Sequence, residues 1–511
     1  MLRKLSLVVL LLFSTQVWSL SSFYQNGWIS KDSGLEFYVQ YPEITESLYL
    51  ENPSQLLWSD SNASSALEFQ LSIIDQAKFS PLFSRQLKRL RYYREQNLWF
   101  EYDILATDTL VFYISYSENA PLIGQPWYFT DKLQSKLPNP SLSALSELKQ
   151  YIVKNQLAIL TMSYAPPVVN YDQFTKSYQL LELSSKKQLE EYVQVGVKRR
   201  GSRLPNRDHL ISRIEMVGIP VRHLSDHVAN YDYELEQAVR AFQKMHGLSA
   251  DGVLGPQTIE WLNMDPESRL NALALNAERA RLWPTERDSL ILVNVPSFEM
   301  KYWQDGEEVF ESKVVVGRKS RKTPLLNTKL DSVIFNPTWN VPWKIMVEDI
   351  LPKAKLDHEY LTNNNFEIIE AWRSSEFVSQ DTIDWDNLKP SRFPYKLRQQ
   401  AGNKNALGLY KFNTPNNRAI YLHDTPSKSL FDKDSRAFSS GCVRVEQAEE
   451  FASLLLETQV LKSADEANIA LGEKTSVSLK KRIPVHIIYQ TVLFGEDGIQ
   501  YRNDIYQYDQ I

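Results

Sequence analysis

Cys442 and His423 are the two residues of this chain whose types and spacing could support covalent chemistry. Cys442 is the only cysteine among 511 residues, and His423 is one of seven histidines. Thiolate is the attacking form of cysteine, and a free thiol with a pKa of about 8.5 is mostly protonated at neutral pH. A histidine that accepts the thiol proton removes this limit, so the pair predicts nucleophilic catalysis. A buried, inert structural thiol is the alternative.

The residues around Cys442 favour the catalytic interpretation. An amphipathic helix is expected over residues 446–457, and a thiol near a helix N-terminus has a lowered pKa. Gly441 permits a tight turn, whose backbone N–H groups could form an oxyanion hole. His423 is expected at the end of a strand. The loop between His423 and Cys442 can fold back and bring the imidazole beside the sulfur.

Composition excludes several other functions. The net charge is -5 and the two signs are interspersed, so no basic face for nucleic acid is expected. A zinc site needs three or four ligands at regular spacing, which one cysteine and scattered histidines do not supply. We therefore expect no metal and no cofactor. Length alone predicts two to four domains.

Residues 1–19 predict an export signal. Arg3 and Lys4 precede the apolar run Leu5–Phe13, which is too short to span a membrane. The mature protein is therefore expected outside the cytoplasm, with an uncleaved signal that anchors it in the membrane as the alternative. An unpaired cysteine is exposed to oxidation in such a compartment, which gives its retention a functional reason.

Residues 20–200 predict a scaffold domain of mixed structure without catalytic residues. Residues 65–76 fit neither period cleanly, although Leu67, Phe69, Leu71 and Ile73 alternate as in a strand. Residues 80–94 predict a helix capped by Ser80, with basic residues between its apolar positions. Residues 107–116 fit either a helix or a strand.

Residues 205–265 predict a small domain of three helices, over 206–217, 233–246 and from Pro256 onward. Gly252 and Gly255 supply the turns before the third helix. The unit resembles the peptidoglycan-binding domain of three-helix type, on Ala238-Val239, Phe242-Gln243, Gly247-Leu248, Asp251-Gly252, Gly255, Thr258 and Leu262-Asn263. A three-helix spacer without a ligand is the alternative.

Residues 286–511 predict a mostly-β domain, because the apolar period changes to two from Leu290. Residues 343–395 look helical and irregular, and predict an inserted lid or a surface excursion. The expected fold class is therefore multidomain α+β. It combines this mostly-β domain and its helical lid with the three-helix domain and the mixed scaffold.

The cysteine segment resembles the catalytic motif of the L,D-transpeptidases with a YkuD-type domain, on His423, Ser439, Ser440, Gly441, Cys442 and Arg444. That family commonly has a second histidine directly before the glycine, where this chain has Ser440. The strings N-P-T-W-N-V-P (336–342), N-A-L-G (405–408) and Y-L-H-D-T-P (421–426) resemble the large periplasmic branch of the family. Members of that branch carry a scaffold, a peptidoglycan-binding module and a lid.

The resemblance implies a mechanism in which His423 takes the thiol proton and Cys442 attacks a tetrapeptide stem of peptidoglycan. D-alanine then leaves, and an amine of a second stem attacks the thioester to form a 3→3 crosslink. Oxyanion or substrate contacts are expected from the remaining candidates, Gly441, Ser440, Ser439, Arg444, Tyr421 and Trp339. The implied partners are stem peptides, glycan strands and other wall-synthesis proteins, with roles in cell-wall biogenesis and cell shape. An L,D-carboxypeptidase and a non-catalytic peptidoglycan-binding protein are the alternatives.

Overall fold

The computed structural model describes residues 34–52, 56–221, 223–224, 229–372, 374, 376–457, 462–496 and 498–510. The chain divides into two compact units. Unit 1 comprises Met1–Pro284, Val492–Tyr501 and Gln507–Ile511, and unit 2 comprises Thr285–Thr491 and Arg502–Tyr506. The predicted export signal lies outside the described residues. Among the described helices, none is long and apolar enough to cross a membrane.

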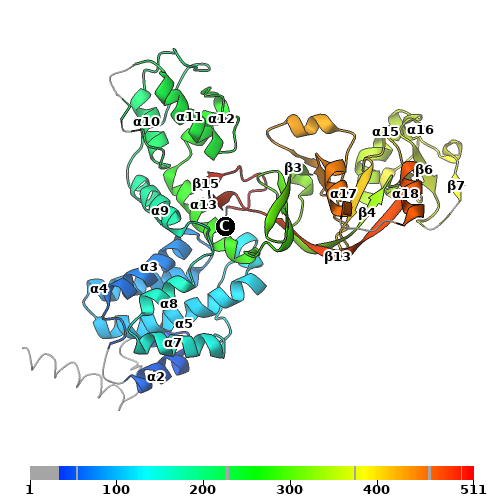
Figure 1. Ribbon diagram of the computed structural model, residues 1–511. Helices are drawn as coiled ribbons and strands as arrows, with labels where there is room; N and C mark the ends of the chain where they lie inside the picture. Colours follow the sequence, from blue (N-terminus) through cyan, green and yellow to red (C-terminus); the bar gives the residue numbers. More distant parts are fainter. Residues whose placement is uncertain are drawn as a thin grey trace, which may run out of the picture. The chain divides into compact units, whose positions relative to one another are not determined.

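The N-terminal part of unit 1 is helical, and not mixed as the sequence pattern predicted (Figure 1). Its α-helices are α2 (Pro42–Glu51), α3 (Ser61–Gln76), α4 (Pro81–Glu95), α5 (Trp99–Ile123), α6 (Gln125–Phe129), α7 (Leu142–Val153), α8 (Leu157–Ser163) and α9 (Tyr171–Ser185). The Ser80 side chain caps α4 by accepting the Phe83 N–H, as its position predicted.

The strand-like stretch is helix α3 because its apolar residues also recur at helical spacing. Leu67, Leu71 and Ile74 lie one turn apart and are all buried. Ile73 is buried as well, since the helix packs against more than one neighbour. The stretch left open between helix and strand lies within α5, whose residues 102–116 are all buried. Burial on every side removes the periodicity from which a helix would be recognised.

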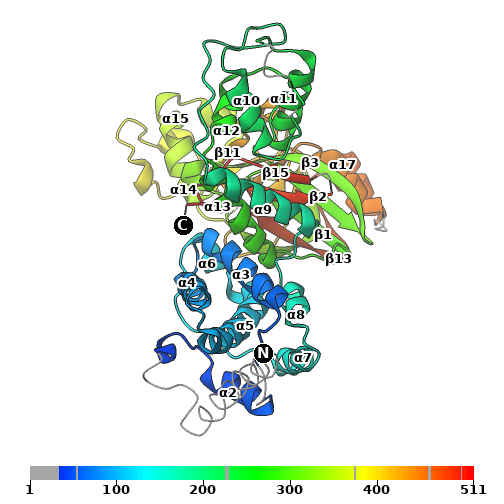
Figure 2. The same ribbon diagram turned by 90° about the vertical axis from the view of Figure 1, so that its left-hand side faces the viewer.

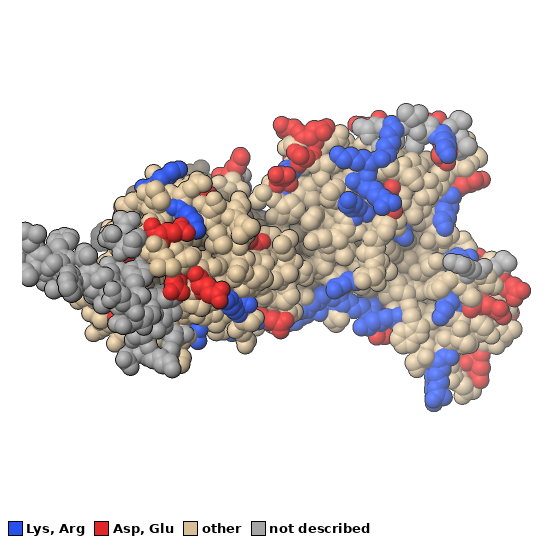
Figure 3. Space-filling view, turned by 90° about the horizontal axis from the view of Figure 1, so that it is seen from below, with Lys and Arg blue, Asp and Glu red and all other residues tan. Residues whose placement is uncertain are grey.

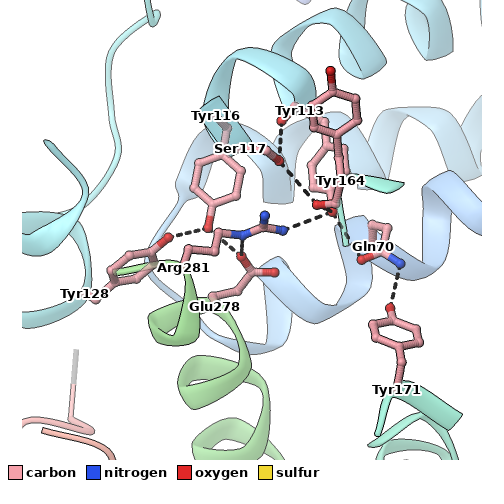
Figure 4. Close-up of polar contacts among 9 residues, drawn as sticks. All are labelled: Gln70, Tyr113, Tyr116, Ser117, Tyr128, Tyr164, Tyr171, Glu278 and Arg281. Atoms are coloured by element: carbon pink, nitrogen blue, oxygen red, sulfur yellow. Dashed lines mark hydrogen bonds and ion pairs between the residues drawn. The ribbon is translucent and has the colours of Figure 1, made fainter. Parts of the chain in front are cut away.

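A buried polar network links α5 to the helix that follows the three-helix domain (Figure 4). The Tyr116 hydroxyl donates to the Glu278 carboxylate at 2.5 Å and lies 2.5 Å from the Tyr128 hydroxyl. Arg281 pairs with the same carboxylate at 2.7 Å. A buried charge is tolerated only when it is paired and hydrogen-bonded, so this network fixes one packing of these helices.

The three expected helices of the small domain are present as α10 (Arg207–Glu215), α11 (Tyr233–Met245) and α12 (Pro256–Leu262) (Figure 2). The Gln243 amide organises the turn between α11 and α12. It donates to Asp251 at 3.0 Å and accepts the Gly252 N–H at 2.8 Å. Gly252 has a φ of 71°, which few residues other than glycine adopt. Helix α13 (Pro266–Arg279) follows.

Unit 2 contains a nine-stranded sheet in the order β11-β3-β12-β10-β9-β4-β13-β1-β2, closed on itself by a further pairing of β2 with β3. The strands are β1 (Ser289–Asn294), β2 (Glu299–Gln304), β3 (Glu307–Gly317), β4 (Leu326–Phe335), β9 (Tyr410–Asn413), β10 (Leu422–His423), β11 (Ala437–Ser439), β12 (Val443–Val445) and β13 (Thr475–Ile488). Helix α17 (Ala448–Glu457) packs Phe451 against Phe310 of β3 and Phe412 of β9, with ring centroids 4.9 and 4.7 Å apart.

The inserted region is helical in its first part, as the sequence predicted, but it also contains strands that the sequence did not predict. Trp343 to Leu356 is helical, as α14 (Trp343–Ile345), a π-helical turn (Met346–Ile350) and α15 (Leu351–Leu356), and α16 (Tyr360–Asn363) follows. A second sheet accompanies these helices, with β5 (Trp339–Asn340), β8 (Lys396–Gln399), β6 (Phe366–Ile369) and β7 (Phe377–Val378) in that order. The region has a hydrophobic core of its own, which includes Leu351, Ile368 and Leu397.

A hairpin follows β13, formed by β14 (Val492–Gly495) and β15 (Gly498–Tyr501). The hairpin belongs to unit 1, where the Tyr501 ring stacks on His246 at 5.5 Å. On the face seen in Figure 3, acidic and basic side chains occur in small separate groups.

Gly408 offers a test of the packing beside β10. It has a φ of 62°, and a Cβ at this position would overlap the Asp424 carboxylate. That carboxylate accepts the Leu409 N–H at 2.9 Å and Lys428 Nζ at 2.6 Å. We expect G408A to lower the free energy of opening of β9 and β10 by about 2–3 kcal/mol, measured by hydrogen–deuterium exchange.

The matched control is G306A, because Gly306 has a φ of 88° but open space where a Cβ would lie. It should cost only the backbone strain, about 1 kcal/mol. Equal exchange in β9 and β10 of the two variants would contradict the assigned role of Gly408.

Candidate active site

The register of two neighbouring strands places the predicted thiol and imidazole together. Strands β10 and β12 are parallel, with Leu422 opposite Val443 and His423 opposite Arg444. The Val443 N–H donates to the Tyr421 carbonyl at 3.2 Å, so the pairing continues one residue back. Because side chains alternate across a sheet, one face carries the four candidate residues Tyr421, His423, Cys442 and Arg444.

His423 is held in a single tautomer. Its Nδ1 lies 2.5 Å from the Asp424 carbonyl oxygen, which can only accept, so Nδ1 carries the proton and Nε2 keeps a lone pair. Burial, and then the positive charge of Arg444, lowers the pKa of His423 to about 3. The imidazole is therefore neutral at physiological pH, as a proton acceptor must be.

The resting Cys442 is a thiol and not a thiolate. Its Sγ donates to the Ala419 carbonyl at 3.8 Å, and burial raises the pKa of the thiol. The N–H and hydroxyl of Tyr421 bond to the sulfur and oppose this shift, as do the charges of Lys411 and Arg444. The expected helix dipole is absent, because β12 follows Cys442 directly and α17 begins only at Ala448. Thiol and imidazole are thus both neutral before any reaction.

Lys411 belongs to this face, although no sequence motif indicates it. It lies opposite His423 on β9, and its Nζ sits 4.2 Å from the centroid of the Tyr421 ring. Burial lowers the pKa of Lys411, and the neighbouring sulfur opposes that shift. Only the pairing of β9 with β10 identifies Lys411, because it lies outside the cysteine motif and its position in the sequence does not indicate that it faces His423.

Ser439 shapes the turn that carries the cysteine. Its hydroxyl accepts the Gly441 N–H at 3.0 Å and donates to the Cys442 carbonyl at 2.6 Å. Gly441 has a φ of 121°, which favours glycine. The Gly441 N–H is therefore occupied. Among the described residues none accepts the Cys442 N–H, which leaves that group able to donate to a ligand.

Thr323 and Tyr506, which sequence reasoning missed, brace the same turn. The Thr323 hydroxyl donates to the Gly441 carbonyl at 2.9 Å and accepts the Gly317 N–H at 2.8 Å. The Tyr506 hydroxyl accepts the Thr323 N–H at 3.0 Å and donates to the Gly317 carbonyl at 2.6 Å. These hydrogen bonds join residues that lie far apart in the sequence, so the local sequence does not reveal them.

Ser440 contacts a charged cluster and not the other site residues. Its hydroxyl accepts from Arg321 at 2.8 Å. Arg321 in turn pairs with Glu348 at 2.5 Å and with Asp349, both in the π-helical turn of the inserted region. The residue that replaces the family's second histidine thus joins the cysteine turn to the insertion.

Arg444 and Trp339 complete the candidate residues. Arg444 Nε is buried without a hydrogen-bond partner, and no carboxylate among the described residues pairs with its side chain. Its charge is therefore available to an anion. The Trp339 side chain hydrogen-bonds to Tyr421, which is consistent with a position beside the thiol. No described group of three or more His, Cys, Asp or Glu residues is arranged to hold a metal ion.

Comparison with known proteins identifies two of the domains. Residues 288–477 match the YkuD family model, described as the L,D-transpeptidase catalytic domain. Residues 224–262 match the model described as "Putative peptidoglycan binding domain". The chain carries an L,D-transpeptidase catalytic domain. The resemblance expected from the cysteine motif and from the three-helix unit is thereby confirmed.

A curated relative from Haemophilus influenzae, named "Putative L,D-transpeptidase", is 40% identical over 272 residues. The match covers 52% of this chain, and the chain spans about half of the relative's length, 55%. An L,D-transpeptidase structure from Mycobacterium smegmatis is 11% identical over 39% of this chain and 58% of that one, with a TM-score of 0.19. One from Xylanimonas cellulosilytica is 15% identical over 59% and 100%, with a TM-score of 0.17. Such low TM-scores carry no conclusion about fold.

We expect K411M to raise the pKa of the Cys442 thiol, because it removes a positive charge that favours the thiolate. The pH midpoint of iodoacetamide alkylation, measured by intact mass, should move upward. K329M is the control, since exposed Lys329 on β4 is not among the groups that shift this pKa. An unchanged midpoint in K411M would contradict the proximity of Lys411 to the sulfur.

His423 should make the stability of unit 2 depend on pH. Its folded pKa is depressed, so the unfolded chain binds the extra proton below about pH 6.5, and stability is lost as the pH falls from there toward 3. In the wild type this proton binding lowers the free energy of unfolding by up to ~1.4 kcal/mol per pH unit, and we expect H423Q to lack this contribution. The measurement is urea unfolding between pH 7 and 5. Exposed His358 provides the control, H358Q, which should keep the wild-type slope.

Proposed function

We propose that this protein is a cysteine-dependent L,D-transpeptidase that forms 3→3 crosslinks in peptidoglycan. The observation that carries the proposal is the parallel pairing of β10 with β12. It sets a neutral imidazole and the chain's single thiol on one face of a domain that matches the L,D-transpeptidase model. The three-helix domain supports peptidoglycan as the substrate.

In the first half-reaction Cys442 attacks the carbonyl of the third stem residue, usually diaminopimelate, of a tetrapeptide donor. The thiol proton passes to Nε2 of His423 as the carbon–sulfur bond forms. Since thiol and imidazole are both neutral at rest, the two movements are coupled, and the imidazolium is stabilised only while sulfur or substrate bears negative charge. The proton then goes to the departing amine, and D-alanine leaves a thioester.

In the second half-reaction an amine of another stem attacks the thioester carbonyl. His423 takes a proton from that amine and returns it to the sulfur, so the enzyme regains its resting thiol. Transfer to water would release a tripeptide instead, which is the L,D-carboxypeptidase outcome. His423 and Cys442 would act in the same way with a stem amine or with water as the acceptor, and the products, a crosslink or a free tripeptide, distinguish the two.

Two groups suit the charges that develop during these steps. The Cys442 N–H, free of acceptors in the described chain, is placed to stabilise the oxyanion, a contribution of about 3 kcal/mol for a good donor. Arg444, which lacks a carboxylate partner there, suits a carboxylate of the stem. Tyr421 bonds to the thiol and, through Trp339, holds that side of the site in place.

The proposal places the protein in the periplasm, where its substrate lies, after export by residues 1–19. The three-helix domain would hold glycan strands and stem peptides, and other wall-synthesis proteins are candidate partners. The inserted region would act as a lid, since Arg321 joins its acidic residues Glu348 and Asp349 to Ser440 of the cysteine turn.

The direct test is the mass of the protein after incubation with a disaccharide-tetrapeptide donor. We expect an adduct on Cys442 that corresponds to the donor minus D-alanine, and no adduct on C442A. H423Q should form the adduct at least ~100-fold more slowly, since it loses the general base. An adduct that persists in C442A would overturn the assignment of the nucleophile.

In cells that lack other L,D-transpeptidases, wild-type protein should restore 3→3 crosslinks in muropeptides analysed by mass spectrometry, and C442A should not. Retained wall binding by C442A would separate loss of chemistry from loss of folding. Tripeptides without crosslinks would identify a carboxypeptidase. Wall chemistry that is the same with C442A as with the wild type would indicate a non-catalytic binding protein.

A further inference from the structure

A groove of about 940 Å³ lies in the helical part of unit 1 and is used by none of the steps above. Helix α4 forms one wall, and its sequence places basic residues between the apolar ones that face the core. Five cationic side chains line the groove against two anionic ones. The cations are Lys78, Arg85, Lys88, Arg89 and Lys132, and the anions are Asp75 and Glu267.

Most of these cations have no charged partner within the described chain. Lys78 pairs with Glu267 at 3.1 Å, in an exposed pair of small energetic value. The ion pairs of the described residues include none with Arg85, Lys88, Arg89 or Lys132. Basic residues at i, i+3 and i+4 of one helix repel one another, so their grouping costs stability unless an anion is bound.

Arg89 is fixed in a geometry that suits a carboxylate. Its guanidinium lies 5.0 Å from the ring of Tyr38, 4.8 Å from Tyr92 and 4.5 Å from Tyr93. Arg85 lies 5.5 Å from the same Tyr38 ring. Stacking on these aromatic faces holds the planar group in place, so little further side-chain entropy is lost when an anion binds. The Arg89 Nε is buried without a hydrogen-bond partner, so the terminal N–H groups are the ones that can contact an anion.

We propose that this groove binds the carboxylate-bearing stem peptides of peptidoglycan, as a second wall contact in addition to the three-helix domain. The inference rests on the proposed function, which takes peptidoglycan as the substrate. Stem peptides carry carboxylates for Arg85, Lys88 and Arg89, and an amine for Asp75. A purely anionic polymer would gain nothing from the two acids in the groove.

The connection to the three-helix domain supports the same ligand. Glu267 lies in the first turn of α13, shortly after α12 ends at Leu262. Helix α13 begins at Pro266, after residues 263–265 that follow the peptidoglycan-binding match at 224–262, and it belongs to the same compact unit. A wall strand engaged by that domain would therefore be presented with a cationic groove in the same body.

The test uses the full chain and reads each lysine separately. The protein is acetylated at low reagent concentration with and without a soluble disaccharide-tetrapeptide, and the extent of reaction is measured by peptide mass spectrometry. We expect the reactivity of Lys88 and Lys132 to fall at least ~3-fold with the ligand. Lys154, Lys176 and Lys187, exposed residues of unit 1 outside the groove, should keep their reactivity.

The variant R85Q/R89Q should abolish this protection, whereas K154Q/K176Q, which removes the same charge elsewhere, should retain it. The same muropeptide with its carboxyl groups converted to amides should give no protection. Inorganic phosphate at equal concentration should give little, and equal protection by phosphate would overturn the assignment to stem peptides.

The thioester adduct on Cys442 is measured in the same samples, so the two proposals can fail separately. Adduct formation without protection of Lys88 and Lys132 would overturn the groove and leave the transpeptidase assignment intact. Protection without an adduct would overturn the catalytic assignment and retain the groove. R85Q/R89Q should form the adduct from a small donor at the wild-type rate, but should bind intact wall material more weakly than K154Q/K176Q.

Discussion

The hydrogen bond from the Val443 N–H to the Tyr421 carbonyl expresses the constraint on which the site depends. It extends the parallel pairing of β10 with β12, and this pairing decides which side chains share a face. A shift of one residue would turn Cys442 away from His423 and onto the opposite face of the sheet, where Leu422 lies. The braces from Ser439 and Thr323 hold the turn in the register that keeps the thiol on the reactive face.

Electrostatics of the face follow from its burial. His423 and Lys411 both have a lowered pKa, chiefly through burial, while the thiol has a raised one. Neutral forms of thiol and imidazole are favoured until a substrate brings charge into the site. The nearby cations, Lys411 and Arg444, then favour a thiolate or an oxyanion. A neutral thiol is less readily oxidised than a thiolate, so the arrangement disfavours oxidation of Cys442 while the site is empty.

Sequence patterns predicted some elements well and others poorly, for identifiable reasons. The three helices of residues 205–265 were predictable because each has one apolar face and a turn signal between neighbours. Helix α3 was not, since its apolar residues recur at strand spacing as well as at helical spacing, and α5 was not, because burial on every side erases the helical period. The sheet of the insertion was not predicted because its strands are very short. A strand such as Trp339–Asn340 is too short to show an alternation of apolar and polar residues.

The sequence by itself determined the family and the candidate pair Cys442 and His423, because one cysteine and a histidine in a distinctive motif need no packing to be recognised. It also indicated peptidoglycan through the motif of the three-helix domain. Tertiary structure alone decided the roles of Lys411, Thr323 and Tyr506, since strand register and long-range contacts bring them to the turn. It also showed that no helix dipole acts on Cys442 and that Ser440 faces Arg321. The physical reason is that motifs record chemical identity, whereas pKa, exposure and hydrogen-bond partners are properties of the packed neighbourhood.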